Sequence, residues 1–300
     1  MANDKLLNKK GQTLEEFLKS YDPDKFKKPS VTVDTLLFSV TSGEPGSYRK
    51  LPGKELKILM IKRGDHPCIG QWALPGGFVE MDENIDTAAA RELMEETGIE
   101  NIYTEQLYTW GNVGRDPRTR IISCSYMALV DSSKLNIKAG DDADAAAWFT
   151  VSTKLVEKTD ESFEEKVVVT SIYELSLTNG TENPKAKIKI VKTYENQTER
   201  TDYEIIESSQ IAFDHAKVIQ YGILRLRSRI SYSGIAFSLL PELFTLTELQ
   251  KLYEAILDTK LLKSDFRRKI SNMVTKTDKF TSGAGHRPSM LYKYNPLWGC

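Results

Sequence analysis

Length, composition and charge limit what this chain can be. It has 300 residues, of which 40% are hydrophobic and 28% charged, and a formal net charge of −1, which is enough apolar material for two ordinary domains. No apolar run approaches the ~20 residues of a membrane-spanning helix, and residues 1–20 are polar and charged, which argues against a membrane helix and a signal peptide. Its three cysteines show no metal-ligand spacing and suit a reducing compartment, so we expect a cytoplasmic protein.

The chain up to residue 152 reads as a short helix followed by strands and one further helix. Thr13 and Glu16 form a capping box that opens the first helix, and a linker with two prolines leads to residue 30. Apolar and alternating stretches then predict strands. The strands are predicted at 31–40, 56–62, 102–110, 120–130 and 146–151, and the second helix at 86–97. Strands around one helix predict an α/β domain over residues 31–152.

The second predicted helix carries an unusual set of polar residues. Residues 77–99 have the spacing G-x5-E-x7-R-E-U-x-E-E-x-G-U, where U is aliphatic. The fixed positions are Gly77, Glu83, Arg91, Glu92, Leu93, Glu95, Glu96, Gly98 and Ile99. Glu92, Glu95 and Glu96 stand at i, i+3 and i+4, so the three carboxylates share one helical face and repel one another unless a cation joins them.

A hard divalent ion such as Mg²⁺, or Mn²⁺, would offset the repulsion among these carboxylates, since such ions prefer oxygen ligands and share their sites with phosphates. We expect Arg91 and Glu83 to be architectural and to fix the loop above the helix. Gly77 belongs to the turn before the helix, and Gly98 stands where a helix commonly ends. A merely solvated acidic face is the alternative, and it leaves the other fixed positions unexplained.

This spacing is the Nudix box, and the chain resembles the Nudix hydrolase superfamily, near the ADP-ribose pyrophosphatases. The resemblance implies an α/β/α sandwich with a mixed sheet. It also implies metal binding by Glu92, Glu96 and the carbonyl of Gly76, with help from Glu95, and attack by a metal-bound water on a nucleoside diphosphate derivative. The general base of such enzymes often lies on a later loop, where Asp141 or Asp142 is our candidate. A plain polar turn explains those aspartates equally well.

Four arginines are candidate substrate ligands. Arg115, Arg118 and Arg120 surround a proline turn, and Arg63 precedes the box on a comparable loop. Guanidinium groups can clamp phosphates or a ribose diol in a bidentate manner. Surface salt bridges are an equally good explanation of the same residues.

Residues 153–210 form a β-rich insertion or linker. Strands at 167–177, 186–191 and 203–206, with a turn at 178–180, predict a β-meander. This meander could cover the active site, extend a dimer interface or join two domains, and the sequence does not choose among these roles.

Residues 211–300 are basic, with 14 Lys and Arg against 7 Asp and Glu, which suggests a second domain with an anionic partner. Helices are predicted at 213–230, 235–240, 245–257 and 263–273, the third of them opened by a capping box at Thr245. A glycine-rich hairpin at 282–296 would form a wing. Two helices joined by a short turn, the second one basic, are typical of a winged helix-turn-helix domain.

Several stretches are similar to the Nudix-related transcriptional regulators, bacterial proteins in which a Nudix domain senses ADP-ribose or a related nucleotide and a C-terminal winged helix binds DNA. They are residues 105–123, 214–257, 266–269 and 285–296. If promoter DNA is a partner, the long, positively charged side chains that could contact it are Arg267, Arg268, Lys269 and Arg287. Composition alone favours a solvated basic helix. We also expect a homodimer.

Two functions follow from these resemblances. The first is an Mg²⁺-dependent hydrolase of ADP-ribose or a related nucleoside diphosphate derivative. The second is an ADP-ribose-responsive DNA-binding regulator of NAD metabolism, with or without hydrolysis. Many such regulators lack acidic residues of the box, whereas this chain has all of them, so we favour the hydrolase.

Overall fold

A computed structural model describes residues 6–42, 53–98, 102, 104–131, 143–281 and 288–298. Within these ranges the strands are β1 (Ser30–Ser42), β2 (Lys54–Arg63), β3 (Trp72–Ala73), β4 (Thr104–Trp110), β5 (Ile121–Leu129), β6 (Ala143–Ser162), β7 (Lys166–Thr178), β8 (Lys185–Glu195), β9 (Thr198–Ser209), β10 (Val274–Phe280) and β11 (Met290–Tyr294). The helices are α1 (Leu14–Ser20), α2 (Ile85–Thr97), α3 (His215–Arg229), the 3₁₀ helix η2 (Ile235–Leu239), α4 (Leu246–Leu257) and α5 (Lys263–Ile270).

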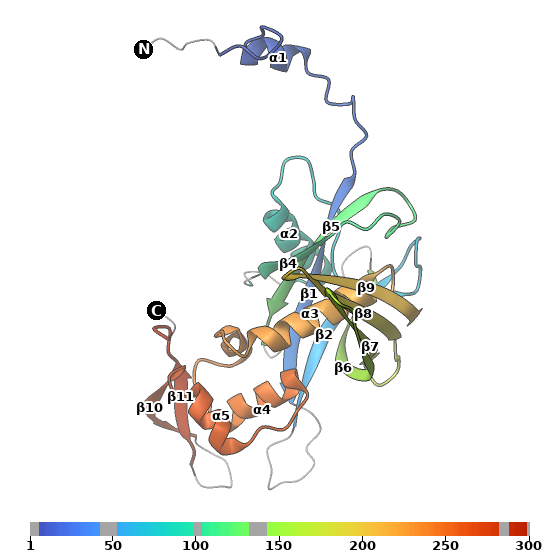
Figure 1. Ribbon diagram of the computed structural model, residues 1–300. Helices are drawn as coiled ribbons and strands as arrows, with labels where there is room; N and C mark the ends of the chain where they lie inside the picture. Colours follow the sequence, from blue (N-terminus) through green and yellow to red (C-terminus); the bar gives the residue numbers. More distant parts are fainter. Residues whose placement is uncertain are drawn as a thin grey trace.

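One mixed sheet organises most of the molecule (Figure 1). Its strand order in the described part of the chain is β4-β5-β1-β2-β6-β7-β8-β9, with β3 beside β2. β1 and β5 pair in parallel, and the other neighbours pair antiparallel. The predicted α/β class with a mixed sheet is confirmed.

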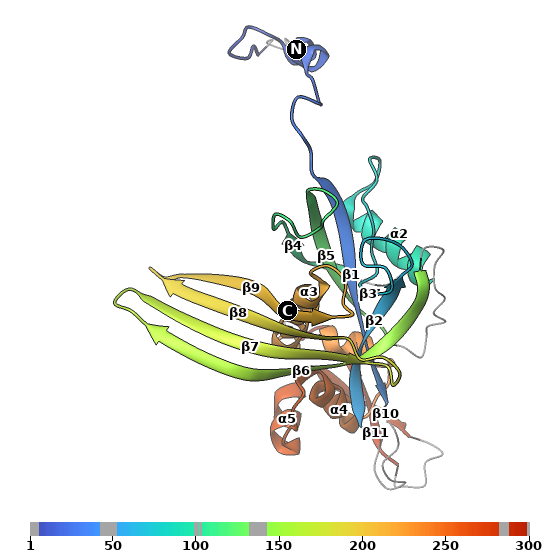
Figure 2. The ribbon, with the colours of Figure 1, turned by 90° about the vertical axis from the view of Figure 1, so that its right-hand side faces the viewer.

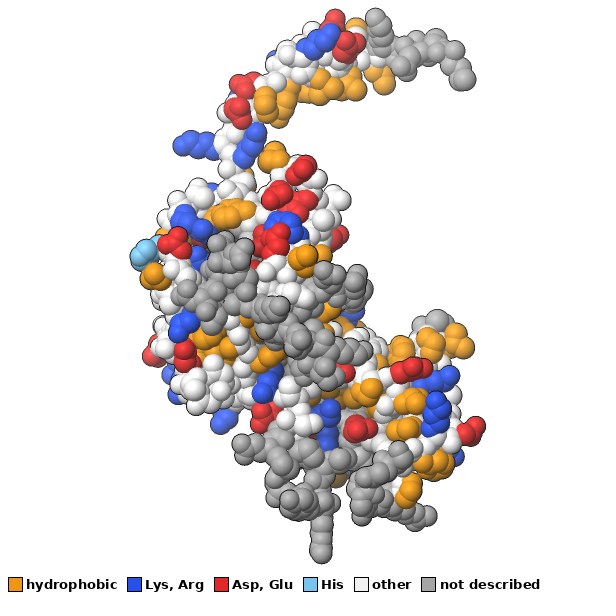
Figure 3. Space-filling view, turned by 180° about the vertical axis from the view of Figure 1, so that it is seen from behind, with side chains coloured by type: hydrophobic (Ala, Val, Ile, Leu, Met, Phe, Trp, Pro, Cys, Tyr) orange, Lys and Arg blue, Asp and Glu red, His pale blue; other side chains and the backbone are white. Residues whose placement is uncertain are grey.

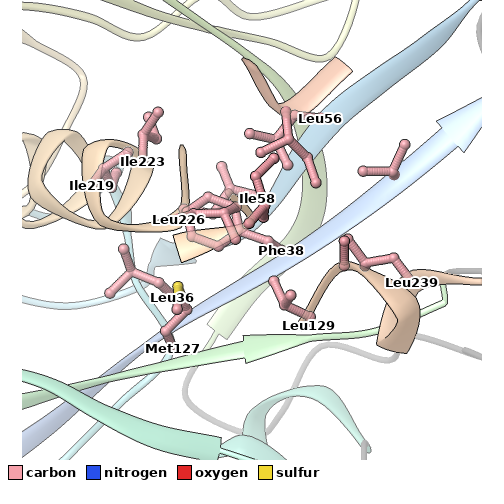
Figure 4. Close-up of a cluster of buried hydrophobic side chains, with 14 of the residues drawn as sticks. Leu36, Phe38, Leu56, Ile58, Met127, Leu129, Ile219, Ile223, Leu226 and Leu239 are labelled. Carbon is pink, nitrogen blue, oxygen red and sulfur yellow. The ribbon is translucent and has the colours of Figure 1, made fainter. Parts of the chain in front are cut away.

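β1 lies at the centre of the core because both of its faces are covered. Its side chains alternate between faces, so Leu36 and Phe38 pack on the side of α3, whereas Leu37 packs with Leu93 of α2. Ile219, Ile223 and Leu226 of α3 complete the first of these layers (Figure 4). A strand buried on both faces need not alternate polar and apolar residues, and β1 accordingly carries Leu36, Leu37 and Phe38 in succession and buries Thr35 and Ser39 as well.

The meander continues the same sheet. β6 pairs with β2 through its first part and with β7 through its second, so this strand passes without a break through residue 152. The predicted strand at 146–151 was therefore too short. β6 to β9 extend away from the body as a long curved arm (Figure 2). Beyond residue 153 most side chains of β6 are exposed, which is why its sequence lacks the apolar signal of a core strand.

The C-terminal residues form the predicted winged helix. α4 begins with the expected capping box at Thr245, and α5 follows after a short turn. β10 and β11 pair as the hairpin of the wing, whose residues 282–287 lie outside the described part. α5 ends at Ile270 rather than near residue 273, because β10 begins at Val274 and the Met273 N–H turns back to the carbonyl of Ile270.

α1 stands apart from the body on an extended linker (Figure 1). Its capping box is formed as predicted, and none of its residues is buried. Hydrophobic side chains gather along one side of this N-terminal segment (Figure 3). Among the described residues, no helix is long and apolar enough to cross a membrane.

We predict that Leu36→Ala lowers the free energy of unfolding by about 2–5 kcal/mol, since it leaves a cavity between the sheet and α3. Leu36 is fully buried. Leu155→Ala is the matched control, because Leu155 also lies in a strand but is 49% exposed and should change stability by less than about 0.5 kcal/mol. Urea unfolding of both variants measures the difference, and equal losses would contradict this account of the core.

Candidate functional site

The site is built where the Gly76-Gly77 turn meets α2. The Gly76 N–H donates a hydrogen bond of 2.6 Å to Oε2 of Glu96. A Cβ on Gly76 would lie 2.0 Å from the carbonyl oxygen of Val33, and its φ of +155° is one that other residues rarely adopt. A Cβ on Gly77 would lie 2.3 Å from Oε1 of Glu92. Gly76 therefore requires glycine so that the turn can pass close to the backbone of Val33, and a side chain at Gly77 would displace the Glu92 carboxylate.

Arg91 ties the loop before α2 to the helix. Its Nε and Nη2 donate to the two carboxylate oxygens of Glu83 at 3.1 and 2.7 Å, a bidentate arrangement. Its Nη1 donates to Glu92 and Glu95 at 2.9 and 3.0 Å. The hydrogen bond with Glu83, together with those to Glu92 and Glu95, raises the pKa of Arg91. These contacts suit the architectural role expected for Glu83 and Arg91. Gly98 adopts the left-handed conformation that ends α2, as predicted.

Glu92 and Glu96 are the carboxylates that face the turn. Burial raises the pKa of Glu96 to about 8, and the nearby charges of Glu92 and Asp34 act in the same direction. Burial likewise raises the pKa of Glu92, although the bond from Arg91 opposes it. In the described residues, no basic side chain forms an ion pair with Glu96. A buried carboxylate in this condition holds a proton or needs a cation.

These two carboxylates fit a divalent cation. No group of three acidic, histidine or cysteine side chains converges as a preformed metal cluster in the described ranges. Glu95 is 54% exposed, shares the Nη1 of Arg91 with Glu92, and does not line the cavity that Glu92 and Glu96 line. Magnesium, however, commonly binds through one or two carboxylates and completes its shell with water and substrate phosphate. Glu92 and Glu96 supply such a set.

A cavity of about 540 Å³ opens in front of these carboxylates. Its other walls combine arginines with aromatic rings. The guanidinium of Arg63 lies 5.1 Å from the ring centre of Phe213, and that of Arg118 lies 5.4 Å from Phe78 and 5.8 Å from Phe213. Such a cavity offers charge for phosphates and flat apolar faces for a planar ring.

The candidate arginines have three different environments. Arg115 is 6% exposed and pairs with Asp214 at 2.7 Å and with Asp34 at 3.7 Å. Arg118 pairs with Asp116 at 2.8 Å but remains 41% exposed at the cavity. Arg120 does not line this cavity, since its guanidinium donates to the carbonyls of Gly111, Asn112 and Ile121. Arg63, Arg115 and Arg118 are thus brought together, and the fourth arginine is separated from them.

Sequence reasoning missed a buried polar cluster beside the cavity. Nδ1 of His215 accepts a hydrogen bond of 2.9 Å from the Leu74 N–H, and its Nε2 lies 3.6 Å from Asp34. Burial lowers the pKa of His215 and keeps it neutral at pH 7. Burial is the largest single effect and would raise the pKa of Asp214, but the hydrogen bonds and charge of Arg115, together with the charge of Lys217, outweigh it and the pKa is lowered. Asp34 and His215 are far apart in sequence, so no local pattern could have joined them.

The remaining candidates divide into two groups. Asp141, Asp142 and Arg287 lie outside the described residues. Arg267, Arg268 and Lys269 are exposed on α5, and only Arg268 has an ion pair, with Asp265 at 3.1 Å, among the described contacts. The surface of α5 is therefore open and basic, as expected.

Two family models match this chain: a NUDIX domain at residues 51–169 and an NrtR DNA-binding winged helix domain at residues 236–294. The ADPR responsive transcriptional repressor NtrR of Acinetobacter baylyi is 31% identical over 287 residues, covering 93% of this chain and 88% of that protein. The ADP-ribose pyrophosphatase of Methanocaldococcus jannaschii is 42% identical over 99 residues, which are 33% of this chain and 57% of that protein.

Solved structures agree with these matches. A MutT/nudix family protein from Enterococcus faecalis shares the fold, with a TM-score of 0.66 and 24% identity over 95% of this chain and 94% of that one. Shewanella oneidensis NrtR gives a TM-score of 0.55 at 25% identity, covering 89% of this chain and 94% of that one. The expected Nudix fold and winged helix are confirmed. The chain therefore belongs to the NrtR family, in which a Nudix domain is joined to a C-terminal winged helix.

Proposed function

We propose that this protein hydrolyses the diphosphate of ADP-ribose or a related nucleoside diphosphate derivative with Mg²⁺ or Mn²⁺. The observation that carries the proposal is the pair of partly buried carboxylates, Glu92 and Glu96, facing a cavity lined by arginines. The similarity to the ADP-ribose pyrophosphatase of M. jannaschii, 42% identical over 99 residues, supports it.

Each wall of the cavity has a part in this proposal. Arg63 and Arg118 bind the phosphates, and the rings of Phe78 and Phe213 beside them offer a surface for a base. Glu92 and Glu96 hold the divalent ion, with the Gly76 carbonyl as a further ligand. When bound, the ion neutralises the charge that develops on the phosphates. Asp141 or Asp142 remains our candidate for the residue that takes the proton from the attacking water.

We propose a second function for the same chain, an ADP-ribose-responsive regulator that binds promoter DNA. The similarity to the A. baylyi repressor supports it, because that match extends over both domains. Exposed Arg267, Arg268 and Lys269 on α5 supply cations for the phosphate backbone, and the wing would add Arg287. A homodimer, which would present two winged helices to DNA, is part of this proposal.

We predict that Glu96→Gln lowers kcat for ADP-ribose with Mg²⁺ by about 10²-fold or more, because the neutral amide binds the ion poorly. Glu95→Gln is the matched control on the same helix, and we expect a smaller loss because Glu95 is 54% exposed and does not line the cavity. Release of AMP measures turnover, and circular dichroism checks the fold. Wild-type kcat in the Glu96 variant would contradict the metal assignment.

The raised pKa of Glu96 also predicts a pH dependence of stability. Between its ordinary value of 4.5 and about 8, folded protein keeps a proton that the unfolded chain has released, so without metal the folded state loses stability as pH rises. In EDTA, we expect the Tm of wild type to fall more than that of Glu96→Gln between about pH 5 and about pH 8. Parallel changes in the two proteins would show that Glu96 has no raised pKa.

We predict that Arg267→Glu with Arg268→Glu abolishes a salt-sensitive gel shift with promoter DNA and leaves hydrolysis unchanged. Each phosphate contact contributes about −0.9 to the slope of log K against log salt, so the wild-type slope reports the contacts that the variant loses. Lys154→Glu with Lys158→Glu is the control, because it makes the same charge change on exposed residues of β6. Equal DNA binding by both double variants would show that α5 is not part of the DNA interface.

A further inference from the structure

A second cavity, of about 560 Å³, lies between β4, β9 and α3 and shares no lining residue with the first. It forms because α3 packs against the meander at one side and against the β4 edge of the sheet at the other (Figures 1 and 2). The Nudix box contributes no residue to it. The function proposed above therefore leaves this cavity without a role.

Four aromatic rings make one wall of the second cavity. Tyr108 lies 4.6 Å from Trp110 and 5.2 Å from Tyr221, measured between ring centres. Tyr203 lies 5.7 Å from Tyr221. Trp110 is buried and donates its indole N–H to Ser125, whereas Tyr108 is 48% exposed. Buried Trp110 thus fixes the position of this wall, and Tyr108 presents an aromatic surface to solvent on which a planar ring can stack.

The cavity also carries positive charge, which comes from side chains of α3. Lys217, Tyr221 and Arg225 stand at i, i+4 and i+8, so they line one face of the helix. Lys217 is buried, with its ammonium 5.2 Å from the ring centre of Trp110. It is already paired with Asp214 at 3.1 Å. Arg225 is exposed and has no ion pair among the described residues, so it is available to an anion.

The acidic residues of the cavity do not cancel this charge. Glu199 is held by Lys192 at 2.7 Å, and Asp202 is held by Arg200 at 2.9 Å. Both are thus already neutralised by a neighbour on the meander. The cavity combines an aromatic wall with an unpaired guanidinium, at a volume typical of small-molecule sites.

We propose that this second cavity binds a nucleotide, with the base stacked on Tyr108 and Tyr221 and the phosphate paired with Arg225. A planar base explains the aromatic wall, and a phosphate explains the cation. A free phosphate would leave the rings unused, and an uncharged ring would leave the guanidinium unused. Neither simpler ligand accounts for both features.

The test is calorimetric titration of AMP, which has no diphosphate to be cleaved, into the full chain without metal. Tyr108→Ala should weaken the binding of AMP by about 5- to 100-fold, the usual loss on removing a ring that stacks on a base. Arg225→Glu should weaken it by about tenfold or more, because it replaces an attractive charge with a repulsive one. Lys158→Glu is the control, an exposed cation on β6 that lines neither cavity, and it should leave the affinity for AMP unchanged.

Crosslinking with 8-azido-AMP separates the two cavities. Labelling of peptides that carry Tyr108, Tyr203 or Tyr221 supports the proposal. Absence of AMP binding, equal affinity in wild type and both cavity variants, or labels confined to peptides around Phe78 and Phe213 would overturn it. The last outcome would place AMP in the first cavity and leave the proposed hydrolase intact. Circular dichroism of Tyr108→Ala and Arg225→Glu confirms that each is folded.

Discussion

The buried ion pair between Arg115 and Asp214 is the contact that the arrangement of this molecule depends on. It joins the loop between β4 and β5 to the start of α3, with nitrogen to oxygen distances of 2.7 and 3.2 Å. Removing Asp214 would leave Arg115 with only the more distant Asp34, at 3.7 Å, and removing Arg115 would leave Asp214 with only Lys217, at 3.1 Å. Loss of one partner of a buried ion pair is strongly destabilising. The pair therefore fixes α3 against the sheet. α3 in turn reaches the winged helix, where Arg227 donates to the carbonyl of Ile256 in α4 at 2.9 Å.

The same ion pair lies between the two cavities. Arg115 lines the first cavity, and Asp214 also pairs with Lys217, which lines the second. An anion that draws Arg115 toward itself competes with Asp214 for the guanidinium, and any change at Asp214 acts directly on α3. A ligand can shift the winged helix only if it binds two arrangements of this contact unequally. Arg115→Lys keeps the positive charge but loses the bidentate hydrogen bonds to Asp214. This variant would therefore distinguish the contribution of the charge from that of the hydrogen-bond geometry.

The sequence predicts the site well where the chemistry is local. The residues from Gly76 to Glu96 lie on one loop and one helix, so their spacing alone brings Glu92 and Glu96 to the same cavity, whereas Glu95 lies outside it. The apolar and β-branched residues of β1 likewise predict a strand, although the polar Asp34, Thr35 and Ser39 within it give no sign that both faces are covered. β6 could not be predicted at its full length, because beyond residue 153 its mostly exposed side chains carry no pattern imposed by a core. The pairing of His215 with Asp34 depends on the tertiary fold and has no sequence signal.

The arginines around the proline turn show where spacing fails as a guide. Arg115, Arg118 and Arg120 are equivalent in sequence, yet one is buried between aspartates, one faces the cavity, and one is held by backbone carbonyls. What separates them is the number of acceptors that the fold leaves near each guanidinium. Arg118 has a single carboxylate partner and remains partly exposed. Of the three, it is therefore the arginine that can bind a phosphate with the smallest loss of existing contacts. A charge of the right sign becomes a binding site only where the fold leaves the group accessible to the ligand.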